Sequence, residues 1–106
     1  YSKFSRDLIR YLEDHFSERL NMKETASHFN CSLPLFNKRF SEDTGETPYR
    51  YLMKYRLGRA AELLRSTLSP VKEIALRVGY SDPLYFSGEF SKIYGVSPKA
   101  YRKQRA

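Results

Sequence analysis

The sequence contains one cysteine, two histidines and five glycines among its 106 residues. A single cysteine, Cys31, excludes an internal disulfide framework and a zinc site built from several thiolates. No apolar run reaches the roughly 18 residues of a membrane span, and no signal-peptide pattern opens the chain. We therefore expect a cytoplasmic protein in a reducing compartment, with no membrane partner. The chain begins with Tyr1 rather than Met, which we expect of a piece of a longer protein.

Motifs for catalysis and for cofactor binding are also absent from the sequence. It shows no nucleophile–base arrangement and no glycine-rich phosphate loop. His15 falls at the end of a predicted helix and His28 on a short one, which favours a structural role over catalysis or metal binding. Cys31 falls in a predicted turn, where a small residue fits. This position favours a structural role for Cys31 over a role as a redox switch. We expect neither an enzyme nor a protein with a cofactor or metal.

Positive charge is concentrated in the second half of the chain. The net charge is +7, and all of it arises from residues 54–106, which hold eleven basic and four acidic side chains. Residues 1–53 hold eight of each. This asymmetry favours a surface that binds a polyanion. A basic surface that only confers solubility is the alternative, and charge alone does not exclude it. The apolar content of 41% favours a folded chain over a disordered one.

The sequence contains an internal repeat, because residues 22–51 align with residues 71–101. The matching pairs at a spacing of 49 are Lys23/Lys72, Glu24/Glu73 and Ala26/Ala75; at a spacing of 50 they are Phe36/Phe86, Phe40/Phe90, Ser41/Ser91, Gly45/Gly95, Pro48/Pro98 and Tyr51/Tyr101. Two copies are too few for a solenoid and indicate one structural unit used twice.

Each copy begins with a short predicted helix and a tight turn. Asn21 is a favoured helix cap, and Ser69 before Pro70 combines a favoured cap with a proline at the first helical position. These first helices are expected to end at Asn30 and Gly79, the residue types that most easily adopt left-handed backbone.

A second helix follows the turn in each copy. Ser32 is expected to cap the first of these helices, and either Ser81 or Asp82 the second. Gly45 and Gly95 are expected to end them.

The remaining segments are helical too. Residues 3–16 carry apolar side chains at helical spacing, and Thr47–Pro48 and Ser97–Pro98 each combine a cap with a first-turn proline. We predict an all-α fold of seven helices with two helix-turn-helix units. The predicted DNA-binding domain at residues 1–106 comprises a first unit at 21–45, a linker helix at 48–66, a second unit at 69–95 and a C-terminal helix at 97–105.

The second helix of each unit has one aromatic face. Phe36 and Phe40 share a face in the first, and Phe86, Phe90 and Ile93 do so in the second. We assign these faces to the core, because their spacing turns them toward the preceding helix.

The opposite faces carry small and polar side chains. They hold Pro34, Asn37, Lys38 and Ser41 in the first unit and Leu84, Ser87, Gly88 and Ser91 in the second. A helix of this kind fits a DNA major groove, where Asn bonds adenine, Lys bonds guanine, and Leu84 contacts a thymine methyl group. An ordinary solvated helix face is the alternative for either helix alone, and the duplication favours the groove.

The length of the linker helix agrees with two reading helices. Its 19 residues span roughly 28 Å, and successive major-groove segments lie about 34 Å apart, so both helices can enter successive segments. Basic residues of the second half are then candidates for phosphate contacts, which give affinity without sequence information. They are Lys54, Arg56, Arg59, Arg65, Lys72, Lys92, Lys99, Arg102, Lys103 and Arg105.

These motifs resemble a known family. The stretch PVKEIALRVGYSDPLYFSGEFSKIYGVSPKAYR at 70–102 is similar to the signature of the AraC/XylS-type bacterial transcription regulators, and residues 21–64 resemble the family's first motif and linker helix. The resemblance covers roughly residues 4–103. It implies a seven-helix domain with two helix-turn-helix units, sequence-specific binding to promoter DNA, and an attached sensor or dimerisation domain. RNA polymerase is a further expected partner.

The resemblance also assigns roles to individual positions. Base reading falls on Pro34, Asn37 and Lys38 in the first unit and on Pro83, Leu84 and Gly88 in the second, with Ser41 and Ser87 beside them. Phosphate contacts are assigned to Ser32, Arg39, Lys54, Lys72, Ser81, Tyr85, Ser91, Lys92 and Lys99.

The sequence departs from the family pattern at three positions. Gly88 stands where many members carry Arg, Glu89 stands where an apolar residue is usual, and Arg39 is the equivalent departure in the first unit. We therefore expect the second unit to rely more on backbone contacts and DNA shape. A helical module that binds RNA polymerase or another acidic protein is the competing class. It predicts exposed aromatic and leucine anchors in place of the small and polar faces.

Overall fold

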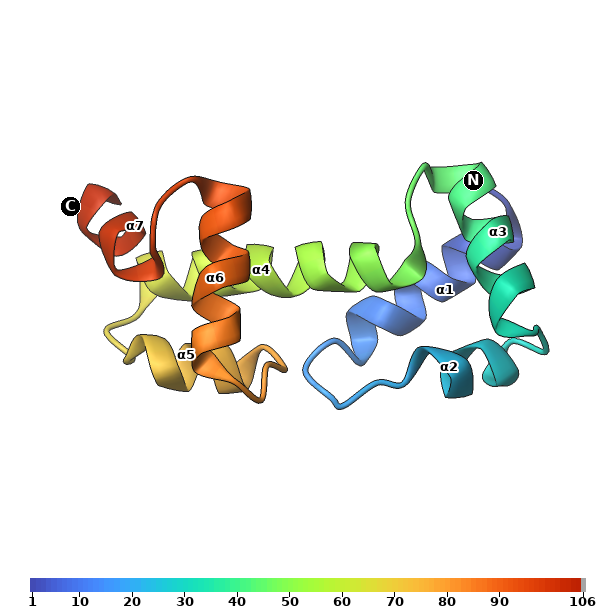
Figure 1. Ribbon diagram of the computed structural model, residues 1–106, viewed down its shortest axis with the longest axis horizontal. Coiled ribbons are helices and arrows are strands. Elements are labelled where there is room, and N and C mark those ends of the chain that lie inside the picture. The colour runs from blue at the N-terminus through green and yellow to red at the C-terminus, as the bar shows by residue number, and fades with distance from the viewer. Residues whose placement is uncertain (106) are drawn as a thin grey trace. The chain divides into compact units, whose positions relative to one another are not determined.

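A computed structural model describes residues 1–105, with side chains described as far as Gln104. Residues 1–105 form seven helices and no strand, which confirms the all-α prediction (Figure 1). The helices are α1 (Lys3–Asp14), α2 (Met22–His28), α3 (Leu33–Thr44), α4 (Pro48–Ser66), α5 (Val71–Arg77), α6 (Pro83–Tyr94) and α7 (Pro98–Arg105). None of these helices is both long and apolar enough to cross a membrane.

The chain forms two compact units, a first unit of Tyr1–Tyr55 and a second unit from Arg56 onward. The core of the first unit lies where α1 and α2 pack against α3. It is built from Leu8, Leu12, Ala26, Cys31, Phe36 and Phe40.

In the second unit, α5 and α7 pack against α6. Phe86 and Phe90 are fully buried there, as predicted. The prediction for Ile93 is wrong, because 42% of this residue is exposed. Ile93 lies near the end of α6, where Tyr94 stacks on Phe90 with ring centroids 4.4 Å apart and so takes the place expected for Ile93.

The turn between the two helices is built in the same way in both units. The Cys31 N–H donates to the Ala26 carbonyl at 2.9 Å, and the Tyr80 N–H donates to the Ala75 carbonyl at 3.0 Å. The residue before each donor has left-handed backbone, with φ of 58° at Asn30 and 101° at Gly79. Only these residue types adopt that conformation at low cost, so their left-handed backbone in the turns is confirmed. The helices themselves end two residues earlier than predicted, at His28 and Arg77.

The caps of α3 and α6 fix where the exposed helices begin and end. The Ser32 hydroxyl accepts the Leu35 N–H at 3.3 Å, as predicted. Of the two candidates in the second unit, Asp82 is the cap, because its carboxylate accepts the Leu84 N–H at 3.0 Å. Both helices end at a glycine in left-handed conformation, as expected.

The predicted cap at Ser69 is wrong. Helix α5 begins at Val71, and Pro70, which lacks a capping side chain, occupies the cap position. Ser69 lies one residue too early for its hydroxyl to reach the first turn. Its carbonyl instead accepts a hydrogen bond from the Arg102 guanidinium at 2.7 Å, which ties α7 to the segment before α5.

Asp43 of α3 holds the start of α1. Its carboxylate accepts the backbone N–H and the hydroxyl of Ser2, both at 2.8 Å. The Ser5 hydroxyl, followed by these two Ser2 donors, lowers the pKa of Asp43 to about 2. Hydrogen bonds of this kind favour the ionised form of a carboxyl group.

We expect the Asp43 contacts to fail in acid. The pKa of Asp43 is about 2 in the folded chain and about 3.9 in the unfolded chain. The contribution of Asp43 to the free energy of unfolding is therefore complete above its unfolded-state pKa. It is lost as the pH falls through its folded-state pKa. Urea midpoints of the wild type should fall between about pH 4 and about pH 2, and those of Asp43→Asn should fall less steeply. Identical pH profiles for the two proteins would contradict this expectation.

Candidate nucleic-acid interface

Helix α3 presents one face to solvent because its other face is fully buried. Phe36 and Phe40 each have 0% exposure. Pro34 and Lys38, two of the predicted base-reading residues, lie on the exposed side. Leu35 is exposed there as well, at 46%.

The other two predicted residues of α3 lie at the edges of this face. Asn37 and Ser41 are half-buried, one helical turn apart. The exposed face of α3 is therefore centred on Pro34 and Lys38, and Asn37 and Ser41 lie at its edges.

Helix α6 presents the equivalent face in the second unit. Leu84 is 84% exposed and Tyr85 is 52% exposed. Gly88 is exposed, and a Cβ atom built on it would meet no heavy atom within 4 Å. Pro83 and Ser87 are half-buried at the edges.

The exposed faces of α3 and α6 are the same positions of the repeat. Pro34 corresponds to Leu84, and Lys38 corresponds to Gly88. Leu35 corresponds to Tyr85 and was not among the predicted site residues. The repeat alignment could have indicated it, because Leu35 aligns with Tyr85, which is among the predicted phosphate contacts.

The side chains that depart from the family pattern have partners within their own units. The Arg39 guanidinium lies 4.1 Å from the centroid of the Phe4 ring and donates to the Cys31 sulfur at 3.5 Å. The half-buried Glu89 forms an ion pair with Lys92 at 3.2 Å. The Lys92 side chain of this pair is 78% exposed, and that of Glu89 is 21% exposed.

The predicted phosphate contacts differ in how available their side chains are. Lys72 and Lys99 are exposed, and Lys54 forms an ion pair with Glu46 at 3.3 Å. The Ser91 hydroxyl is half-buried and donates to the Ser87 carbonyl at 2.9 Å. The exposed residues in the remainder of the set are Ser32, Arg39, Ser81, Tyr85 and Lys92.

Several of the ten basic residues named as candidates for phosphate contacts are buried or hydrogen-bonded within the chain. Arg56 is only 7% exposed, which removes it from the candidates for phosphate contacts. Arg102 donates to two backbone carbonyls at 3.1 and 2.7 Å, and Arg65 donates to the Tyr101 hydroxyl at 2.9 Å. The side chain of Arg105 lies outside the described residues. Arg77, exposed at the end of α5, was missed although it belongs to the basic half of the sequence.

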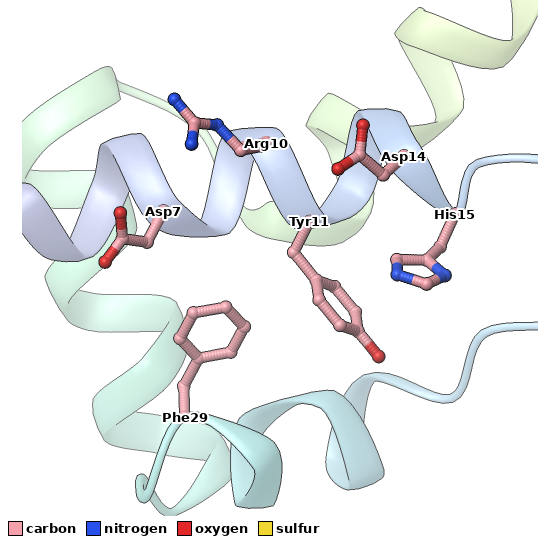
Figure 2. A pocket seen from close by; sticks show the side chains of 6 residues that line it. All are labelled: Asp7, Arg10, Tyr11, Asp14, His15 and Phe29. Carbon is pink, nitrogen blue, oxygen red and sulfur yellow. The ribbon is translucent and has the colours of Figure 1, made fainter.

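A shallow depression of about 220 Å³ lies elsewhere on the first unit. Figure 2 shows Tyr11 projecting from α1 into it, with His15 farther along the chain and Phe29 opposite. The Tyr11 ring packs 4.4 Å from His15 and 4.9 Å from His28. The lining includes none of the predicted DNA contacts.

Two helix-turn-helix units with the same turn and the same exposed positions define the class of this protein. A family model described as a helix-turn-helix domain matches residues 25–104. The chain belongs to the AraC/XylS-type helix-turn-helix family of transcription regulators. It is 39% identical over 98 residues to the HTH-type transcriptional activator RhaS of Escherichia coli, which covers 92% of this chain. The chain spans 35% of the length of that relative.

Solved structures show the same fold. The C-terminal domain of AraT, a response regulator from Geobacillus stearothermophilus, superposes with a TM-score of 0.93 at 39% identity, over 98% of this chain and 87% of that one. The DNA-binding domain of AdpA, a global transcriptional factor, was solved in complex with a target DNA. It superposes with a TM-score of 0.91 at 29% identity, over 97% of this chain and 93% of that one.

Proposed function

We propose that this chain is the DNA-binding domain of a bacterial transcription regulator and binds double-stranded DNA sequence-specifically. The observation that carries the proposal is the exposed face of α3 opposite Phe36 and Phe40, repeated at the equivalent positions of α6. The complex of the similar AdpA domain with its target DNA supports it. Residues 21–45 and 69–95 are the reading units in this proposal, with 48–66 as linker and 97–105 as the C-terminal helix.

The first unit reads bases through polar side chains of α3. The exposed ammonium group of Lys38 is suited to the guanine O6 and N7 acceptors, and the amide of Asn37 is suited to adenine. Pro34 and the Leu35 side chain add apolar contact at the start of the helix. Cations of both units add affinity through phosphates, which position the protein without specifying sequence.

Both units engage the DNA in this proposal, in successive major-groove segments. Support comes from the repeat of the exposed positions and from the continuous 19-residue helix α4, which carries residues of both units. Selection from randomised duplexes should then enrich two blocks whose centres lie about 10 base pairs apart. A single block would contradict reading by both units, and no enrichment at all would contradict the proposed function.

Replacing Lys38 by alanine should both weaken binding and relax the preference for one base pair. The expected loss is about 1–3 kcal/mol, because a lost lysine–guanine contact removes discrimination as well as affinity. Competition among duplexes that vary at each position measures this preference.

Lys23→Ala is the matched control. Lys23 is an exposed lysine of α2 in the same unit, and it is not a predicted DNA contact. The control removes the same charge and should leave the preference profile unchanged. A Lys38→Ala profile identical to that of the control would reject the assignment.

The whole regulator has further parts in this proposal. The chain covers 35% of the length of RhaS and 28% of the length of the xylose-binding transcription activator XylR. In this proposal the whole regulator likewise has a sensor or dimerisation domain in addition to the DNA-binding domain. RNA polymerase is the proposed protein partner at the promoter, and the cytoplasm the proposed location. No catalytic step is part of the proposal.

A further inference from the structure

We propose that α6 reads thymine through its C5-methyl group, that Leu84 is the specificity-determining residue, and that Gly88 provides the clearance for the approach. This inference rests on the proposed function, because it concerns how the second unit discriminates among duplexes.

Leu84 is an apolar side chain held in solvent. It is 84% exposed at the first turn of α6, whereas Phe86 two residues later is fully buried. Its backbone N–H is fixed by the Asp82 cap, so the side chain projects from a well-defined helix start. A leucine has no donor or acceptor, and the thymine methyl group is the base-edge feature that an apolar side chain recognises in the major groove.

Gly88 lies one turn after Leu84 on the same face. Glycine in a helix interior is less stable than alanine, and here no packing contact requires it, since an added Cβ atom would meet nothing within 4 Å. The position has ordinary helical backbone, so left-handed conformation does not explain the glycine either. The missing side chain leaves the helix backbone free to approach the groove floor.

Two polar side chains of the next turn of α6 have partners within the helix. The Ser91 hydroxyl donates to the Ser87 carbonyl at 2.9 Å, and Lys92 pairs with Glu89 at 3.2 Å. In the first two turns of α6 the exposed residues are Leu84, Tyr85 and Gly88. In the first unit the position equivalent to Gly88 is Lys38, so α3 presents a cation at the position where α6 presents no side chain.

Replacement of thymine by deoxyuridine tests this inference, because it removes the methyl group and keeps the base pair. The duplex enriched by selection with the whole chain is the probe, and each thymine of the second block is replaced singly. We expect about a fourfold loss of affinity at one position, the value of one buried methyl group. Leu84→Ala should discriminate less between the thymine and deoxyuridine duplexes, since the shorter side chain buries less of the methyl group.

Leu68→Ala is the matched control, because Leu68 is 96% exposed and lies outside α6. It should keep the fourfold discrimination. Gly88→Ala, which the open space accommodates, should fold with a raised melting temperature and yet bind the duplex more weakly.

Three results would overturn the inference: a second block without thymine, equal binding of the thymine duplex and every deoxyuridine duplex by the wild type, or discrimination that Leu84→Ala leaves undiminished. Failure of the proposed function has a different signature, since no duplex would then be enriched at all.

Discussion

Raising the monovalent salt concentration from about 50 to about 200 mM is expected to lower the affinity for the selected duplex by roughly 500-fold. Each phosphate neutralised by a cation releases counterions, and the slope of log affinity against log salt is about −0.9 per contact. The predicted phosphate contacts include five cations: Arg39, Lys54, Lys72, Lys92 and Lys99. Five contacts give a slope of about −4.5, and titrations at four salt concentrations measure it.

The slope of log affinity against log salt also shows whether two ion pairs of the free chain break when DNA binds. Lys54 and Lys92 pair with Glu46 and Glu89, and exposed pairs of this kind contribute little to stability. We therefore expect both lysines to exchange their carboxylates for phosphates. If both ion pairs persisted, only Arg39, Lys72 and Lys99 would count, and the loss would be about 40-fold.

Single substitutions test the number of phosphate contacts. Lys72→Ala should reduce the magnitude of the slope by about one for every duplex tested. Lys23→Ala, an exposed lysine that belongs to neither set of predicted phosphate contacts, is the control and should leave the slope unchanged. An affinity that does not change with salt would contradict binding dominated by phosphates.

Local chemistry made most of the fold predictable. The turns at Asn30 and Gly79 and the ends of α3 and α6 depend on residues that adopt left-handed backbone, a property of the residue itself. Ser69 shows where this reasoning fails. Its sequence context is that of a cap, but the start of α5 is set by how Pro70 and the Arg102 hydrogen bond hold the chain.

The candidate site was predictable where the repeat constrained it. The burial of Phe36 and Phe86 places Lys38 and Leu84 on the opposite, exposed faces, and period alone gives this result. The contacts of Arg39 with Phe4 and Cys31 could not be predicted, because they join residues of different helices. The burial of Arg56 was missed for the same reason, since charge says nothing about which side of α4 packs against its neighbours.

Truncation of the repeated core phenylalanines should give the largest losses of stability. Phe40→Ala and Phe90→Ala each remove a side chain with 0% exposure, and such changes cost about 3–5 kcal/mol in free energy of unfolding. At about 4 °C per kcal/mol, the melting temperature should fall by at least about 12 °C. Urea denaturation followed by circular dichroism measures the loss.

The ring contacts decide which loss is larger. Phe40 meets the Tyr51 ring at 5.9 Å, whereas Phe90 stacks on Tyr94 at 4.4 Å and also meets Tyr101 at 5.4 Å. Because aromatic pairs add about 0.5–1.5 kcal/mol each, Phe90→Ala should be the more destabilising. Leu84→Ala, an exposed truncation in the same helix, should change stability by about 0.5 kcal/mol or less. Equal effects of Phe90→Ala and Leu84→Ala would mean that α6 presents the wrong face to solvent, and the base-reading assignments of that helix would fall with it.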